Sequence, residues 1–131
     1  MPQLKHKKHQ RSERTFHPTI SFIVPLFNME AETARCIEKL FDYAAKYEGF
    51  VEIFIVDNGS QDNTYELAYA AVELNKRRKF PKVRTKLIRL TARLQISEIT
   101  ELCSKFALGQ KIAVVKCEKT RIEAKTVTVK Q

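Results

Sequence analysis

The chain has 131 residues, of which 44% are hydrophobic and 30% are charged. It is therefore long and apolar enough to bury one core, and it is not composed like a disordered segment. Its three glycines stand alone, which excludes the clustered glycines of a Walker loop or a dinucleotide-binding turn. No apolar run approaches the roughly 20 residues of a membrane span. The N-terminal charges are not followed by the hydrophobic stretch of a secretory signal, so we expect a cytoplasmic protein.

The formal net charge of +9 is spread unevenly along the chain. Residues 1–14 hold five basic residues against one acidic residue, and residues 15–75 hold three against ten. Residues 76–131 hold sixteen against four. Such asymmetry indicates an anionic partner, which can be a nucleic acid, a phosphorylated ligand or an acidic protein surface.

The cysteines Cys36, Cys103 and Cys117 are far apart and form no Cys-x-x-Cys pair. An odd, scattered set argues against a disulfide framework and against a zinc knuckle. Each cysteine lies in an apolar pattern. We therefore expect buried free thiols in a reducing compartment.

Taken in chain order, the hydrophobic pattern predicts a basic flexible arm over residues 1–16 and a single domain over residues 17–131. The expected strands are 20–25, 50–56, 83–90 and 111–115, with a strictly alternating edge strand at 125–129. The expected helices are 30–47, 65–78 and 95–108. We expect Pro25 to end the first strand because it cannot donate a ladder hydrogen bond. In the second helix we expect an inward face made of Leu67, Ala68, Ala71, Val72 and Leu74.

This alternation of strands and helices predicts an α/β fold with three layers, in which helices flank a mostly parallel sheet. Ligands of such sheets bind beyond the carboxyl ends of the strands. The polar clusters around Asn28 and Asp57 both follow predicted strands. The sequence therefore places its candidate site at this edge.

Two motifs lie at these strand ends. Ile-Val-Pro-Leu-Phe-Asn-Met-Glu ends at Glu30, and Ile-Val-Asp-Asn-Gly-Ser-Gln-Asp-Asn-Thr ends at Thr64. In register, they resemble the start of the family 2 nucleotide-sugar glycosyltransferases. That family has a strand ending in Pro-x-Tyr-Asn-Glu, then a helix, then a strand ending in Val-Asp-Asp-Gly-Ser-x-Asp-x-Thr. The resemblance covers about residues 20–90, and it implies a Rossmann-like half of a GT-A domain.

The resemblance implies a pocket for a nucleoside diphosphate or a nucleotide-sugar. Its implied binding residues are Pro25, Phe27, Asn28, Glu30, Asp57, Gly59 and Ser60. Phe27 replaces the usual Tyr, Glu30 matches an acidic residue near the ribose, and Asp57 accepts a hydrogen bond from the base. Asp-Asn-Gly-Ser is also an ordinary strand-to-helix turn, so the inference depends on both motifs together.

Two departures from the family pattern affect catalysis. Where the family has the metal-binding Asp-x-Asp, this sequence has Lys116-Cys117-Glu118, so only Glu118 remains as a weak ligand for Mg²⁺ or Mn²⁺. Thirteen residues follow Glu118, and no general base can be assigned. We expect a protein that is incomplete as a transferase unless another subunit completes the site. Whether it is an enzyme stays open.

A dense basic stretch runs from residue 76 to residue 93, with nine positive charges and no carboxylate. We identify as candidate anion-binding or nucleic-acid-binding residues Lys76, Arg77, Arg78, Lys79, Lys82, Arg84, Arg89 and Arg93. One alternative function is therefore a degenerate glycosyltransferase-like module that binds nucleic acid or a ribonucleoprotein through its basic arm and its basic second half. Another is a structural subunit that docks on an acidic protein. A solvated helix end and strand face would explain the same pattern.

Overall fold

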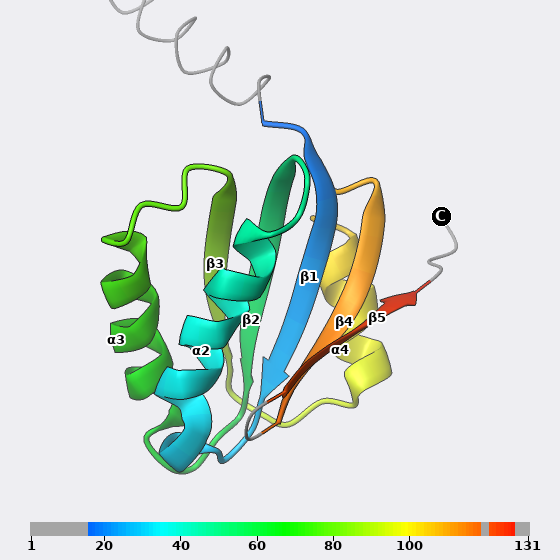
Figure 1. Cartoon of the computed structure of the whole chain (residues 1–131). Coiled ribbons are helices and arrows are strands. Elements are labelled where there is room, and N and C mark those ends of the chain that lie inside the picture. The colour runs from blue at the N-terminus through cyan, green and yellow to red at the C-terminus, as the bar shows by residue number, and fades with distance from the viewer. Residues whose placement is uncertain (1–15, 119–120, 128–131) are drawn as a thin grey trace, which may run out of the picture.

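The strands and helices follow the predicted alternation in the computed structural model, which describes residues 16–118 and 121–127 (Figure 1). The elements are β1 (Pro18–Leu26), α2 (Glu30–Ala45), β2 (Phe50–Asn58), α3 (Thr64–Lys76), β3 (Val83–Leu90), α4 (Ile96–Ser104), β4 (Lys111–Glu118) and β5 (Arg121–Val127). The last strand begins four residues before its predicted start, and residues 128 and 129 of that prediction lie outside the described residues. Most of the predicted arm also lies outside them, but Phe16 is buried and packs edge-on against Phe50.

The described strands form a five-stranded sheet in the order β3-β2-β1-β4-β5. Pairing is parallel from β3 to β4, and only β5 is antiparallel. Helices α2 and α3 cover one face, and α4 covers the other (Figure 1). The predicted three-layer, mostly parallel α/β fold is confirmed.

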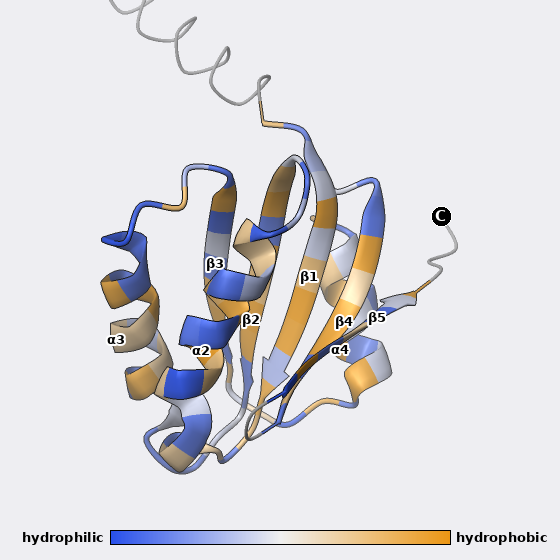
Figure 2. Cartoon of the chain, in the orientation of Figure 1, coloured by the Kyte–Doolittle hydropathy of each residue, from blue (hydrophilic) through white to orange (hydrophobic). Residues whose placement is uncertain are grey.

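The core follows from the apolar runs of the two central strands. β1 and β2 are buried on both faces, so they are apolar nearly throughout, as Figure 2 shows. On one face Phe22 belongs to the cluster that α2 covers, and its ring contacts those of Tyr43 and Tyr47. On the other, Ile23 and Phe54 pack against Ile99 of α4. No helix in the described ranges is both long and apolar enough to span a bilayer.

Pro25 does not end β1 as we expected, because the strand continues to Leu26. Pro25 pairs with Val56 on the β2 side, whereas the pairing of β1 with β4 already ends at Ile23. The prolyl residue therefore lies where β1 has a strand neighbour on one side only. Proline is tolerated at such positions.

The inward face of α3 also differs from the prediction. Leu67 and Leu74 are 37% and 61% exposed. Ala68, Ala71 and Val72 are buried as expected, and the polar side chains of Thr64 and Asn75 complete the buried face. Asn75 is accommodated because its side-chain amide donates to the carbonyl of Ala71 at 2.8 Å.

The expectation of free thiols is wrong for two of the three cysteines. Cys36 of α2 and Cys117 of β4 form a disulfide, with Cα atoms 5.7 Å apart. Only Cys103 is a free thiol, and burial raises its pKa to about 11. The sequence argument failed because the bond joins residues 81 positions apart, which no local spacing reveals. Because Cys36 and Cys117 form a disulfide, the cysteines no longer support the expectation of a reducing compartment.

Candidate functional site

The candidate site lies at the carboxyl edge of the sheet, where the loops after β1, β2 and β3 meet. Strand register brings these loops together, since Asp57 pairs with Leu26 on one side and with Arg89 on the other. Segments that are more than 30 residues apart in the sequence therefore share one edge. This is the edge at which ligands of parallel α/β sheets bind.

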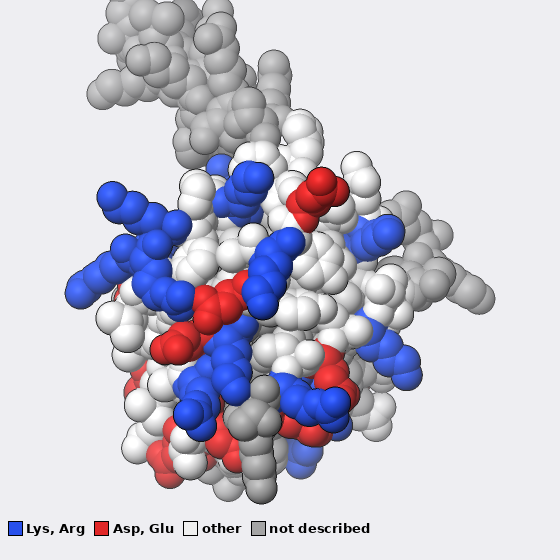
Figure 3. Space-filling model, viewed as in Figure 1, with Lys and Arg blue, Asp and Glu red and all other residues white. Residues whose placement is uncertain are grey.

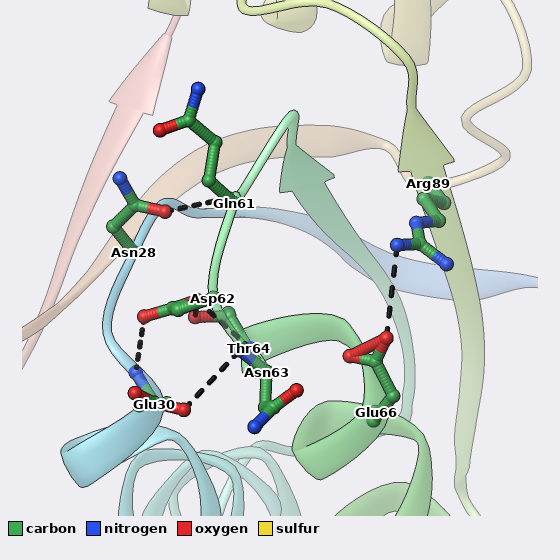
Figure 4. A network of polar contacts seen from close by, with 8 residues as sticks. All are labelled: Asn28, Glu30, Gln61, Asp62, Asn63, Thr64, Glu66 and Arg89. Carbon is green, nitrogen blue, oxygen red and sulfur yellow. Dashed lines mark hydrogen bonds and ion pairs between the residues drawn. The ribbon is translucent and has the colours of Figure 1, made fainter.

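The two sequence motifs are hydrogen-bonded to each other (Figure 4). Ser60 Oγ accepts from the backbone N–H of Asn28 at 2.9 Å, and Asn28 Oδ1 accepts from the backbone N–H of Gln61 at 2.8 Å. Thr64 Oγ1 accepts from the backbone N–H of Met29 at 2.8 Å. Asn28 adopts a φ of 43°, a left-handed conformation that asparagine tolerates better than most residues. The loop after β1 is thus shaped by side chains of the loop after β2.

Acidic side chains link the N-terminal ends of α2 and α3 in both directions (Figure 4). Asp62 Oδ2 accepts from the backbone N–H of Glu30 at 3.3 Å, and Glu30 Oε2 accepts from the backbone N–H of Asn63 at 3.3 Å. The hydroxyl of Thr64 donates to Asp62 Oδ1 and lowers the pKa of that carboxyl. Each carboxylate thus sits at the positive end of the other helix. Glu30, which we predicted near a ribose, has this structural role as well.

Asp57 is the unusual residue of the edge. It is completely buried at the end of β2, and neither carboxylate oxygen has a hydrogen-bond partner among the described residues. Buried polar atoms in proteins are almost always hydrogen-bonded, and a carboxylate without partners is costly. An ionised carboxylate only accepts hydrogen bonds. A ligand that presents N–H or O–H donors would supply these partners once the groups that cover Asp57 in this conformation move aside.

Asn58 and Gly59 fix the loop that follows β3. The side-chain amide of Asn58 donates to the carbonyl of Leu94 at 2.9 Å, and its oxygen accepts from the N–H of Leu94 at 2.8 Å. Gly59 has a φ of 72°, and a Cβ there would lie 3.0 Å from the carbonyl carbon of Ala92 and from the nitrogen of Arg93. Only glycine permits so close an approach. We did not identify Asn58 from the sequence, although it stands where the family pattern has its second Asp.

The same loop brings Arg93 to the first motif. Its guanidinium carbon lies 4.0 Å from the centre of the Phe27 ring. A cavity of about 570 Å³ next to it is lined by Asn58, Arg93, Leu94, Gln95, Ile96 and Glu98. The structure thus places one of the basic candidates, Arg93, beside Phe27 of the first motif.

The described residues do not fit a divalent metal at the position of the family's Asp-x-Asp. Glu118 is 56% exposed at the end of β4, and its carboxylate pairs with Lys116 Nζ at 3.1 Å. The positive charge of Lys116 would repel a metal cation bound to the same carboxylate. Within residues 16–118 and 121–127, no group of three or more His, Cys, Asp or Glu side chains is arranged to hold an ion.

The structure does not gather all of the basic candidates into one surface, although Lys76 and Arg84 line one cavity together with Phe80. Lys76, Arg77, Arg78, Lys79 and Lys82 lie at and after the C-terminal end of α3, at the edge opposite the site. Arg84 and Arg89 lie on opposite faces of β3, where one stacks on Phe16 and the other pairs with Glu66. The Lys and Arg side chains visible in Figure 3 accordingly form separate groups.

Comparison with known proteins agrees with this architecture. The family model for glycosyl transferase family 2 matches residues 21–115, and the chain therefore belongs to that family. A search of curated proteins finds no match.

Two solved structures show the same fold at low sequence identity. A mannosyltransferase, PcManGT from Pyrobaculum calidifontis, in complex with GDP-Man and Mn²⁺, is 22% identical with a TM-score of 0.59; the match covers 88% of this chain and 34% of that one. TarS 1–349 of S. aureus in complex with UDP is 22% identical with a TM-score of 0.53, over 76% of this chain and 27% of that one. The chain thus spans about a third or less of the length of these proteins.

Proposed function

We propose that this chain binds a nucleoside diphosphate, free or as part of a nucleotide-sugar, at the carboxyl edge formed by the loops after β1, β2 and β3. The observation that carries the proposal is Asp57, a fully buried carboxylate whose two oxygens have no partner among the described residues. Membership of glycosyl transferase family 2 supports the ligand class. So do the solved structures of similar fold, which contain GDP-Man in one case and UDP in another.

The chemistry of Asp57 also bears on the base. Uracil and guanine each present a ring N–H donor to a carboxylate, whereas cytosine has an acceptor nitrogen at the corresponding ring position. Because a carboxylate only accepts, the pocket should favour UDP or GDP over CDP. Sugar transfer needs a general base as well, and we assign none to the described residues. We therefore propose binding as the activity of the described residues, with transfer only where further protein completes the site.

Isothermal titration calorimetry with UDP, GDP and CDP tests the proposal. Asp57→Asn keeps the shape of the side chain and removes its charge, so we expect affinity for the best ligand to fall about 10- to 100-fold. Glu73→Gln is the matched control, because Glu73 is an exposed carboxylate on α3 that contacts Lys76. Equal affinity of the Asp57→Asn variant and the control would refute the assignment of Asp57. No binding of any diphosphate would refute the function.

The competing proposals for nucleic acid and for an acidic protein rested on the basic second half and, for nucleic acid, also on the basic arm, most of which lies outside the described residues. In the described residues the candidate cations are divided between two edges and both faces of the sheet, and several are already engaged. Arg78, for example, pairs with Asp42 at 2.6 Å. No contact in the structure favours either partner over a nucleotide.

A further inference from the structure

The phosphates of the proposed ligand need a source of positive charge. The mannosyltransferase of similar fold contains Mn²⁺, but the residues at the corresponding strand end of this chain do not fit a metal, as Lys116 and Glu118 pair with each other. We propose, on the basis of the proposed nucleotide site, that Arg93 binds the diphosphate directly. Nucleotide binding by this chain is then independent of divalent metal.

The cations at the carboxyl edge differ in what they already contact. Lys116 is paired with Glu118 at 3.1 Å, and Arg89 is paired with Glu66 at 3.7 Å. Arg93 has no carboxylate within ion-pair distance among the described residues; its recorded contact is the face of Phe27. That contact leaves the N–H groups at the rim of the guanidinium able to donate. A guanidinium offers paired donors that match phosphate oxygens, and its charge does not depend on pH in the physiological range.

The backbone of Arg93 is held in place although its side chain is exposed. Asn58 bonds both the N–H and the carbonyl of Leu94, the next residue. Gly59 lies so close to Ala92 and Arg93 that a Cβ would be 3.0 Å from the Arg93 nitrogen. Asn58 and Gly59 directly follow Asp57 in the chain. The residue proposed to bind the base and the residue proposed to bind the phosphates are therefore anchored to one another.

The contacts of the Arg93 side chain also support the proposal. A solvated arginine next to a pocket usually pairs with an available acid, yet this one lies over the ring of the first motif, at the mouth of a cavity of about 570 Å³ that it helps to line. A cation–π stack at an exposed position is weak, so an anion that binds the guanidinium more strongly than the Phe27 ring does can draw it away from the ring. The phosphates of a nucleotide are such an anion.

The test is calorimetry of the full chain with UDP and GDP in EDTA and in Mn²⁺. It compares the wild type with Arg93→Gln, Arg93→Lys and the control Arg77→Gln. Arg77 lies at the C-terminal end of α3, at the opposite edge of the sheet, so its loss changes the net charge equally. We expect wild-type affinity to be the same in EDTA and Mn²⁺. We expect Arg93→Gln to weaken diphosphate binding about 10- to 100-fold and Arg93→Lys to weaken it less.

Uridine and guanosine, measured by saturation-transfer NMR, separate the phosphate role from a base-stacking role. An Arg93→Gln variant that loses affinity for the diphosphates but not for the nucleosides supports the proposal. Equal losses of affinity for diphosphates and nucleosides would show that Arg93 holds the base and would overturn the proposal. Diphosphate binding that needs Mn²⁺ would also overturn it. So would an affinity of the Arg93→Gln variant equal to that of Arg77→Gln. If the wild type binds neither diphosphate in either buffer, the nucleotide site itself is refuted, and this inference falls with it.

Discussion

Reduction of the Cys36–Cys117 disulfide should destabilise the fold by several kcal/mol. The bond closes a loop across 81 residues, and the chain-entropy relation gives about 4.5 kcal/mol at 25 °C for a loop of that length. Native disulfides commonly contribute about 2–4 kcal/mol, so the relation is an upper value. With a urea m-value of about 1.5–2 kcal/mol/M for a chain of this size, the midpoint should fall by about 1–3 M.

The assay is urea unfolding with and without a phosphine reductant, preceded by a count of free thiols in denaturant. One thiol, that of Cys103, is expected before reduction. The Cys36→Ala/Cys117→Ala variant should unfold at the reduced midpoint and should not respond to reductant, whereas Cys103→Ala should keep the response. Three free thiols in protein that was never reduced, or an unchanged midpoint on reduction, would refute the reasoning.

Two further predictions concern the loops of the site. Asn58→Ala removes both hydrogen bonds to the backbone of Leu94 and should lower the free energy of unfolding by about 2 kcal/mol. It should also weaken nucleotide binding, because the backbone next to Arg93 is released. A variant with native stability in urea would contradict the first effect. The pKa of Asp62 in the folded protein is depressed mainly by the hydroxyl of Thr64. Ionised Asp62 therefore stabilises the folded state at pH values above its pKa in the unfolded chain. This stabilisation is lost as the pH falls through the lower pKa of the folded protein. Titration by NMR should show that pKa rising towards its ordinary value in Thr64→Val, and an unchanged value would count against the hydrogen bond as its cause.

The sequence was sufficient to predict the order of elements and the location of the candidate site. The apolar runs at β1 and β2 are short and rich in β-branched and aromatic residues, which favours strands buried on both faces, and parallel pairing then places Asn28 and Asp57 at one edge. These inferences need only hydrophobic periodicity and chain direction. The match of residues 21–115 to the family model confirms the family resemblance carried by the same motifs.

Other features depend on packing between distant segments, which periodicity does not describe. Leu67 and Leu74 fit a helical stripe, but α3 buries Thr64 and Asn75 instead. Asn58 read as a turn residue, and its partner Leu94 lies 36 positions further on. The basic residues are contiguous in the sequence, yet an eight-residue strand of about 26 Å lies between their two ends.

The reciprocal hydrogen bonds between the loops after β1 and β2 have a consequence for the order of folding. The amides of Asn28, Met29 and Gln61 are bonded to side chains 32–35 positions away, so none can be protected until β1 and β2 have paired. The strand amide of Val51 donates to the carbonyl of Lys82 at 2.8 Å, so its protection does not depend on the formation of these loops. In a pulsed hydrogen-exchange experiment these loop amides should therefore gain protection after the strand amides of β1 and β2.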